Sequence, residues 1–140
     1  LIKVKEIKFS INFNDNDPGM KEILLRRRSE LLLGLSNIIE NAADFASTTV
    51  ELNVSKSGKF INLEINDDGK GFSNSILSRI GDPYVSSRSK SSNNGDGLGL
   101  GFFISKTLLE RLNISVQAYN KVHPEHGAVV LIKIPYDVYS

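Results

Sequence analysis

The sequence contains no cysteine, and its charges nearly cancel. Among 140 residues, 17 are Lys or Arg and 16 are Asp or Glu, which leaves a formal net charge of +1. The lack of cysteine excludes disulfides, thiolate metal sites and thiol catalysis. Because the balanced charge creates no overall field for nucleic acid or an acidic membrane, any polyanion must be bound locally.

Long apolar runs are also missing. No stretch approaches the roughly 20 residues needed to span a bilayer. The chain begins at Leu1 with neither an initiator Met nor a signal peptide, so we expect a piece excised from a longer protein, whose missing part could carry a membrane anchor. The 40% content of hydrophobic residues suits one globular domain over residues 1–140.

Hydrophobic periodicity predicts the order of the helices and strands. Apolar spacings of three and four predict a long amphipathic helix over 27–46 and a second over 98–112. Ser73 is expected to cap a short helix that reaches Ile80. Period-two alternation predicts a strand with one buried face over 2–13, and further strands are predicted at 48–54, 59–66, 114–121 and 128–134.

This order of elements, with hairpins in it, predicts an α/β (α+β) two-layer sandwich rather than a doubly wound parallel sheet. We expect a mixed, mostly antiparallel sheet of about five strands packed on about three helices. Residues 82–97 hold many serines, two asparagines and one proline, with few apolar anchors. Such a long polar connection within a compact domain is typical of a mobile functional lid.

The first segment with chemical content is Asn37-Ile-Ile-Glu-Asn41 on the long helix. Asn37 and Asn41 are four residues apart, so their amides lie on one helix face. An amide oxygen is a neutral, hard ligand that suits Mg²⁺ already carrying phosphate oxygens. Taken alone, however, paired asparagines on a helix are more often plain polar surface.

The second segment is Asp67-Asp68-Gly69-Lys70-Gly71, at the end of a predicted strand. The carboxylate of Asp67 offers an acceptor for an exocyclic amine, and Gly69 and Gly71 would let the backbone approach a flat ring. Alone, such a segment is more often an ordinary β-turn, because Asp-Gly is a common turn pair.

The third segment is Gly95-Asp-Gly97-Leu-Gly99-Leu-Gly101, which runs directly into a predicted helix. Bare backbone N–H groups at a helix N-terminus form a phosphate cradle. A dinucleotide fingerprint is the competing interpretation, but it requires a short strand-turn-helix unit. The long polar segment before these glycines disfavours that alternative.

The three segments together, in this order and spacing, resemble the N, G1 and G2 boxes of the Bergerat-fold (GHKL) ATP-binding superfamily over nearly the whole chain. Within it, the chain is similar to the catalytic domains of bacterial sensor histidine kinases. The segments 41–46 and 81–84 look closest to the RegB/PrrB group of these kinases.

The resemblance implies a role for each of these residues in binding Mg·ATP. Asp67 would accept a hydrogen bond from the adenine amino group, with Gly69 and Gly71 beside the base. Asn41 would bind Mg²⁺, and Asn37 would support the phosphate side. The lid and the following helix would supply further nucleotide contacts, namely Tyr84, Gly95, Gly97, Leu98, Gly99 and Leu100.

The resemblance also implies the reaction and the partners. Such a kinase transfers the γ-phosphate to a histidine on a separate dimerisation domain, which passes it to the receiver domain of a response regulator. The parent would be a homodimer anchored in the bacterial inner membrane, with this domain in the cytoplasm and no nucleic-acid partner. Glu40 is a candidate base, although it projects about 100° away from Asn41. His123 and His126 are expected to be exposed turn residues, so the acceptor histidine should lie outside this chain.

Two alternatives remain open. ATP-hydrolysing relatives of the gyrase, MutL and HSP90 type carry a glutamate one turn before the metal-binding asparagine; here that position is Asn37, whose amide cannot accept a proton from water. A non-catalytic nucleotide sensor is the other, and Asp44 keeps it open, because many of these kinases have a phosphate-contacting Lys or Arg there. A carboxylate at that position would repel triphosphate.

Overall fold

The computed structural model describes residues 6–14, 28–80 and 97–135; for residues 97–100 it describes the backbone alone. Five strands and three helices follow one another: β1 (Lys8–Phe13), α1 (Ser29–Phe45), β2 (Thr49–Ser57), β3 (Phe60–Asp67), α2 (Asn74–Ile80), α3 (Gly97–Arg111), β4 (Ser115–Asn120) and β5 (Ala128–Pro135). None of the described helices is long and apolar enough to cross a membrane. The predicted two-layer sandwich of strands and helices is therefore confirmed.

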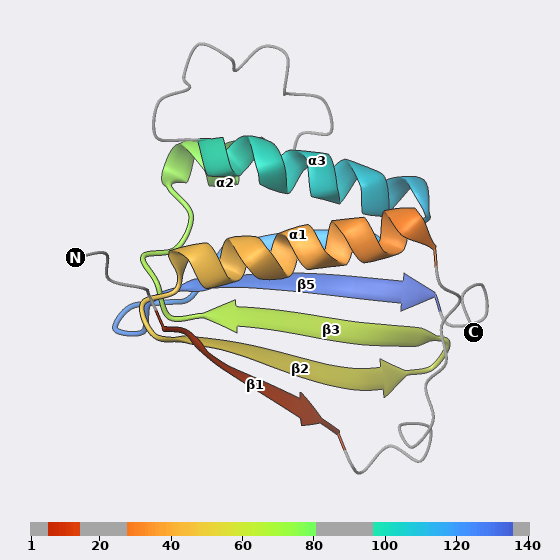
Figure 1. The fold of residues 1–140 in the computed structure, drawn as a ribbon, viewed down its shortest axis with the longest axis horizontal. Helices are drawn as coiled ribbons and strands as arrows, with labels where there is room; N and C mark the ends of the chain where they lie inside the picture. The colour runs from red at the N-terminus through yellow and green to blue at the C-terminus, as the bar shows by residue number, and fades with distance from the viewer. Residues whose placement is uncertain (1–5, 15–27, 81–96, 136–140) are drawn as a thin grey trace.

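The sheet has the order β1-β2-β3-β5-β4. β1 pairs with β2 in parallel, and the other three pairings are antiparallel. Figure 1 shows the helices on one side of the sheet, with α1 running beside α3. α1 contacts β3 and β2, whereas α2 and α3 contact β4. The end of α1, the end of β3 and the start of β5 therefore meet near the connection that leads into α2.

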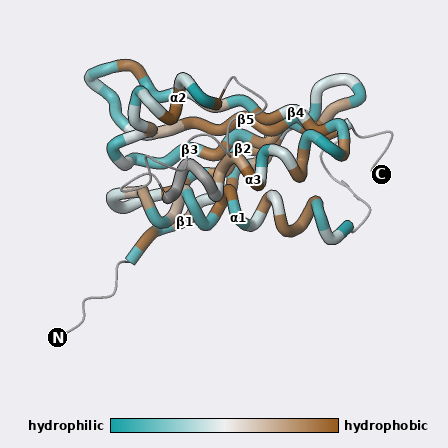
Figure 2. The backbone as a smooth tube through the Cα atoms, turned by 90° about the horizontal axis from the view of Figure 1, so that it is seen from above, coloured by the Kyte–Doolittle hydropathy of each residue, from teal (hydrophilic) through white to brown (hydrophobic). Residues whose placement is uncertain are grey.

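The core lies between the sheet and the helices because the strands alternate. Ile65 pairs with Val130, and Leu52 pairs with Ile65, so apolar side chains face the helices in register. Asn66 and Glu64, on either side of Ile65, lie on the opposite face, the open face, which none of the described helices covers. In Figure 2 the strands carry brown apolar stretches, while the helices alternate between brown and teal. This is the amphipathic pattern from which the fold was predicted.

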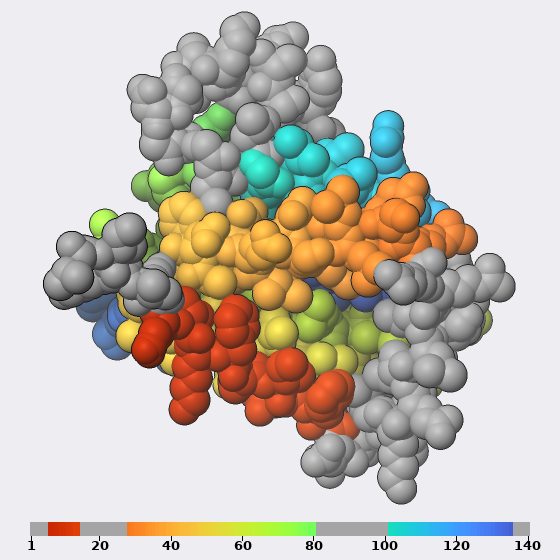
Figure 3. Space-filling view, viewed as in Figure 1, coloured from red at the N-terminus to blue at the C-terminus, as the bar shows by residue number. Residues whose placement is uncertain are grey.

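β1 corrects one expectation. Its alternation predicts a buried face, but every described residue of the strand is exposed. Phe9, Ile11 and Phe13 pair with core residues of β2, yet they remain 49%, 57% and 57% exposed. The physical reason is position: β1 is the edge strand, and the helices cover the strands farther into the sheet. Figure 3 shows the atoms of β1 (red) open to view at the rim of the sheet, next to α1 (orange).

At two positions in the helices and the hairpin, the local structure explains why the residue is a glycine. Gly34 of α1 lies against Leu109 of α3, where an added Cβ would be 2.7 Å from Leu109 Cδ2. The helices therefore approach closely and antiparallel at this point. In the β2–β3 hairpin, the turn falls at Gly58, which has φ +60, and β2 continues to Ser57 rather than ending at Val54 as predicted.

Candidate functional site

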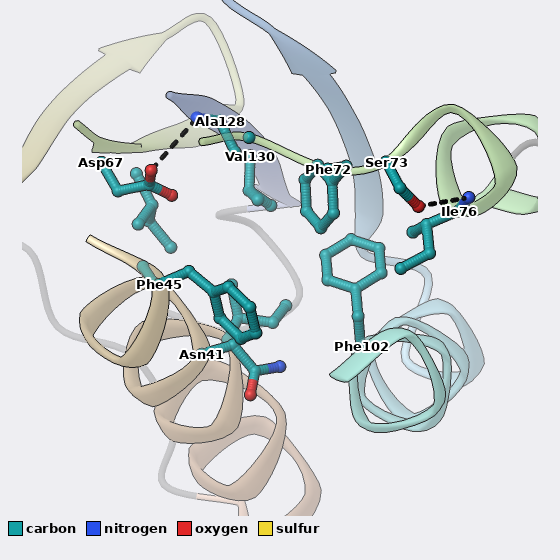
Figure 4. Close-up of a pocket in the computed structure, with 13 residues that line it drawn as sticks. Asn41, Phe45, Asp67, Phe72, Ser73, Ile76, Phe102, Ala128 and Val130 are labelled. Atoms are coloured by element: carbon teal, nitrogen blue, oxygen red, sulfur yellow. Dashed lines mark hydrogen bonds between the residues drawn. The ribbon is translucent and has the colours of Figure 1, made fainter. Parts of the chain in front are cut away.

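A cavity of about 150 Å³ opens between α1, the end of β3, α2 and the start of α3. Figure 4 shows side chains from these elements arranged around one space. Most of the lining is apolar, and three residues contribute polar side chains: Asn41, Asp67 and Ser73. The apolar lining consists of Ile38, Ala42, Phe45, Ile65, Gly71, Phe72, Ile76, Phe102, Ala128 and Val130. An apolar cavity with a few placed polar groups is typical of a small-molecule site.

Asp67 is the buried acid of this cavity, with 6% of its surface exposed. Its Oδ1 accepts hydrogen bonds from Gly69 N at 2.9 Å and from Ala128 N at 3.2 Å. Both hydrogen bonds made to it by the described residues go to Oδ1, and in Figure 4 the second oxygen lies on the pocket side. The carboxylate is thus held rigidly by one oxygen, while the other is available to a ligand.

The neighbouring Asp68 ties the loop after β3 to the connection between α1 and β2. Its carboxylate accepts hydrogen bonds from Ser47 N at 2.8 Å, Thr49 N at 3.1 Å, and Thr48 N and Oγ1 at 2.9 and 2.6 Å. Although burial alone would raise the pKa of Asp68, the Thr48 hydroxyl and the three backbone N–H groups together hold that pKa well below its usual range. Asp68 therefore holds the connection that follows α1 next to Asp67.

The glycines of the Asp67–Gly71 segment are packed against protein atoms. A Cβ on Gly69 would lie 1.9 Å from the Phe45 carbonyl oxygen, so this glycine lets the loop pass the end of α1. Gly71 has φ +84 and does line the cavity. Gly69 is absent from the lining, so the expected contact between Gly69 and a bound base stays a prediction.

Asn41 lies on the wall formed by α1, on the side that faces α3. Its Nδ2 is buried and has no hydrogen-bond partner within the described part of the chain. A Cβ on Gly101, in the first half of α3, would lie 3.9 Å from that nitrogen. Since an unpaired buried amide is costly, this one is suited to meet a ligand. The Asn41 amide and the Asp67 carboxylate thus line one cavity, and Gly101, at the end of the glycine segment, lies close to Asn41.

The other predicted site residues have different outcomes. Asn37 is half-buried one turn before Asn41 and does not line the cavity, and Glu40 is exposed on α1. Gly97, Leu98, Gly99 and Leu100 form the first turn of α3. Tyr84, Gly95 and the predicted lid as far as residue 96 lie outside the described residues. Within the described ranges, no cluster of three or more His, Asp or Glu side chains forms a metal site.

Sequence reasoning missed the aromatic walls and the support from the β4–β5 connection. Phe72 and Phe102 pack edge to face, with ring centroids 5.4 Å apart. His126 is exposed, as predicted, but its Nδ1 lies 3.1 Å from Gly69 O. Asn120 and Gly127 also contact the Asp67–Phe72 loop. The glycine after a polar turn was a weak signal for Gly127, whereas the contact between Asn120 and Phe72 had no signal in the sequence.

Comparison with known sequences places these features in one family. The family model for histidine kinase-, DNA gyrase B-, and HSP90-like ATPases matches residues 26–138. Sensor histidine kinase RegB of Cereibacter sphaeroides is 39% identical over 147 residues, which cover 95% of this chain and 32% of that protein. Sensor protein KdpD of Clostridium acetobutylicum is 34% identical over 104 residues, covering 73% of this chain and 11% of that protein.

Solved structures share the fold. The nucleotide-free catalytic domain of histidine kinase ThkA has a TM-score of 0.67 at 16% identity and covers 93% of this chain and 80% of that one. Full-length ShkA in complex with AMPPNP has a TM-score of 0.64 at 21% identity and covers 93% of this chain and 26% of that one. This chain spans about a third of the length of RegB, 32%. The chain belongs to the histidine kinase-, DNA gyrase B-, and HSP90-like ATPase family, and within it to the ATP-binding catalytic domains of sensor histidine kinases.

Proposed function

We propose that this domain binds Mg·ATP with the adenine ring in the cavity between α1, β3 and α3. The observation that supports this best is the Asp67 carboxylate, whose Oδ1 accepts two backbone hydrogen bonds while Oδ2 accepts none from the described residues. An available carboxylate oxygen in an apolar pocket accepts a hydrogen bond from an amino group, such as the exocyclic one of adenine. In this proposal the cavity of about 150 Å³ takes the adenine ring alone, and the phosphates would extend past Asn41.

Asn41 would hold the metal end of the nucleotide. Its amide is partly buried and Nδ2 is unpartnered among the described residues, which fits a group awaiting a ligand. The Asn41 oxygen is the neutral, hard donor that suits Mg²⁺ bound to phosphates, and Mg²⁺ would offset their negative charge. Asn37 would support the phosphates from the same helix. The backbone N–H groups of Gly97–Leu100, at the N-terminus of α3, suit phosphate oxygens, and Tyr84, Gly95 and the lid complete the proposed contacts.

The parent kinase would transfer the γ-phosphate to a histidine on its own dimerisation domain, which would then phosphorylate a response-regulator receiver domain. His123 and His126 are the only histidines of this sequence, and both are exposed in the β4–β5 connection. A histidine acceptor on a separate domain is consistent with their position. In such transfer, the protein contributes mainly positioning and charge stabilisation. Glu40 would polarise the incoming imidazole.

We further propose a homodimeric parent anchored in the bacterial inner membrane, with this domain on the cytoplasmic side.

Calorimetric titration with ATP and GTP, with and without Mg²⁺, tests nucleotide binding. Asp67→Asn should weaken ATP binding by roughly 10- to 100-fold and narrow the preference for ATP over GTP, because the amide can donate to the guanine oxygen. Asn41→Ala should abolish the gain in affinity that Mg²⁺ provides. Asn62→Ala, on the open face of the sheet, is the control and should bind like the wild type. Equal binding of ATP and GTP by the wild-type domain would contradict the proposed adenine site.

Phosphotransfer needs a separate test. Incubated alone with radiolabelled ATP, the domain should acquire little phosphohistidine, but it should label an added helical domain that bears an acceptor histidine. Glu40→Gln should slow this labelling without changing ATP affinity. ATP binding without any labelling would favour a nucleotide sensor. Rapid phosphate release that Asn41→Ala abolishes would favour an ATPase of the clamp type.

A further inference from the structure

Asn120, the last residue of β4, makes a two-hydrogen-bond contact with the loop that lines the cavity. Phe72 N donates to Asn120 Oδ1 at 2.8 Å, and Asn120 Nδ2 donates to Phe72 O at 2.8 Å. One side-chain amide thus pairs with both backbone groups of a residue 48 positions away, as a neighbouring strand would. Because these bonds are partly buried, their loss would leave Phe72 backbone groups to find other partners.

The contact between Asn120 and Phe72 requires a glycine at position 71. Gly71 has φ +84, and a Cβ there would lie 2.7 Å from Asn120 Oδ1 and 2.9 Å from Asn120 Cγ. The missing side chain at Gly71 therefore makes room for the Asn120 amide to reach Phe72. The second glycine of the Asp-x-Gly-x-Gly segment is thus required by a protein contact, in addition to any approach to a base.

The contact fixes one wall of the cavity. Phe72 lines the cavity and packs edge to face on Phe102, with an interplanar angle of 64°. Phe102 follows Gly101, where an added Cβ would lie 3.9 Å from Asn41 Nδ2. Figure 4 shows Phe72 and Phe102 next to each other on the side of the pocket opposite Asp67. The segment 71–72 has no helix or strand of its own, so a bound ring would meet a wall whose position depends on Asn120.

We propose that Asn120 is a positioning residue for the nucleotide site: its amide holds the Gly71–Phe72 backbone so that the Phe72 ring is preorganised against the adenine ring. This rests on the proposed Mg·ATP site. Removing Asn120 leaves the loop to be ordered when the nucleotide binds, and that ordering lowers affinity. The loss of affinity should come from the contacts with the adenine ring, because Asn41 and the Mg²⁺ it would hold lie on a different element, α1.

The test compares Asn120→Ala, Asn120→Asp and a matched control. Asn53→Ala is the control because it also removes an amide with several hydrogen bonds from the same sheet, but on the open face. Asn120→Ala should weaken ATP and adenosine by the same factor, about 3- to 10-fold, measured by competition with a fluorescent ATP analogue. The ratio of ATP affinities with and without Mg²⁺ should stay at its wild-type value, and Asn53→Ala should bind both ligands normally.

Asn120→Asp separates hydrogen bonding from side-chain volume. It keeps the acceptor for Phe72 N–H but places a carboxylate oxygen against the Phe72 carbonyl, so it should weaken binding at least as much as Asn120→Ala. In the wild type, the Phe72 amide should exchange slowly with solvent deuterium, a result that does not depend on how well any variant folds.

The outcomes are distinct. If the wild type fails to bind ATP, the proposed function is wrong. If the wild type binds but Asn120→Ala binds like Asn53→Ala, the positioning role alone is overturned. A loss of thermal stability with unchanged affinity of the folded protein, or a Phe72 amide that exchanges as fast as an unprotected one, would overturn it equally.

Discussion

Gly127 lies at the start of β5, where its backbone packs directly on that of Asp67. It has φ +125, and an added Cβ would lie 1.9 Å from Asp67 O and 2.8 Å from Asp67 C. These are backbone atoms, so no side-chain rotation relieves the overlap. Gly127→Ala must therefore separate β5 from the end of β3, the point at which Ala128 N donates to the Asp67 carboxylate.

The cost of Gly127→Ala follows from two effects. A non-glycine residue in such a backbone conformation costs about 1–3 kcal/mol. Inserting a methyl group into a packed region costs a further ~1–3 kcal/mol. Together they lower the free energy of unfolding by about 2–6 kcal/mol, against a total of about 5–15 kcal/mol for a typical domain. The domain should stay folded at 20 °C, with the Asp67 carboxylate displaced.

Gly58→Ala provides the matched control. Gly58 also has a positive φ, +60, in a β-hairpin turn, but nothing lies within 4 Å of its added Cβ. Gly58→Ala should cost only the free energy of holding a non-glycine residue at a positive φ, about 1–2 kcal/mol. Urea denaturation at pH 7 measures both, and calorimetry with ATP should show weaker binding for Gly127→Ala alone. A loss of stability in Gly127→Ala no larger than in Gly58→Ala would refute the steric argument, and unchanged ATP affinity would refute the link to Asp67.

Three further predictions concern the framework of the site. Hydrogen bonding holds the folded-state pKa of Asp68 below the unfolded value of about 3.9, so the stability that Asp68 contributes is present above that pH and is lost as the pH falls through the folded-state pKa. Urea titrations should show the wild type more stable than Asp68→Asn at pH 7, with the difference in stability shrinking below about pH 4. A difference that stays constant with pH would count against this prediction. Gly34→Ala should lower the urea midpoint, at a cost of about 1–3 kcal/mol, because its Cβ would overlap the buried Leu109 side chain; an unchanged midpoint would mean that α1 and α3 separate freely. Asn113 has φ +63 just after α3, so Asn113→Gly should leave the thermal midpoint unchanged or higher while Asn113→Val lowers it, and equal midpoints for the two variants would contradict the left-handed cap.

Much of the fold and part of the site could be predicted from local sequence patterns. The three- and four-residue spacings of α1 located that helix within two residues at its start and one at its end. Asp67 and Asn41 were recognised because a carboxylate before glycines and spaced helix amides are chemical features visible along the chain. The resemblance to a family implied that both bind one nucleotide, and the structure places both side chains in the lining of one cavity.

The order of the elements, the apolar face of each and the residue types that suit a nucleotide were predictable along the chain, because periodicity and side-chain chemistry are properties of short segments. Three-dimensional packing leaves β1 exposed, which could not be predicted because alternation marks a face but not what covers it. The same packing lets Asn120 hold Phe72 and Gly127 support Asp67. Such contacts join residues far apart in the chain, and nothing in the local sequence around either partner indicates them.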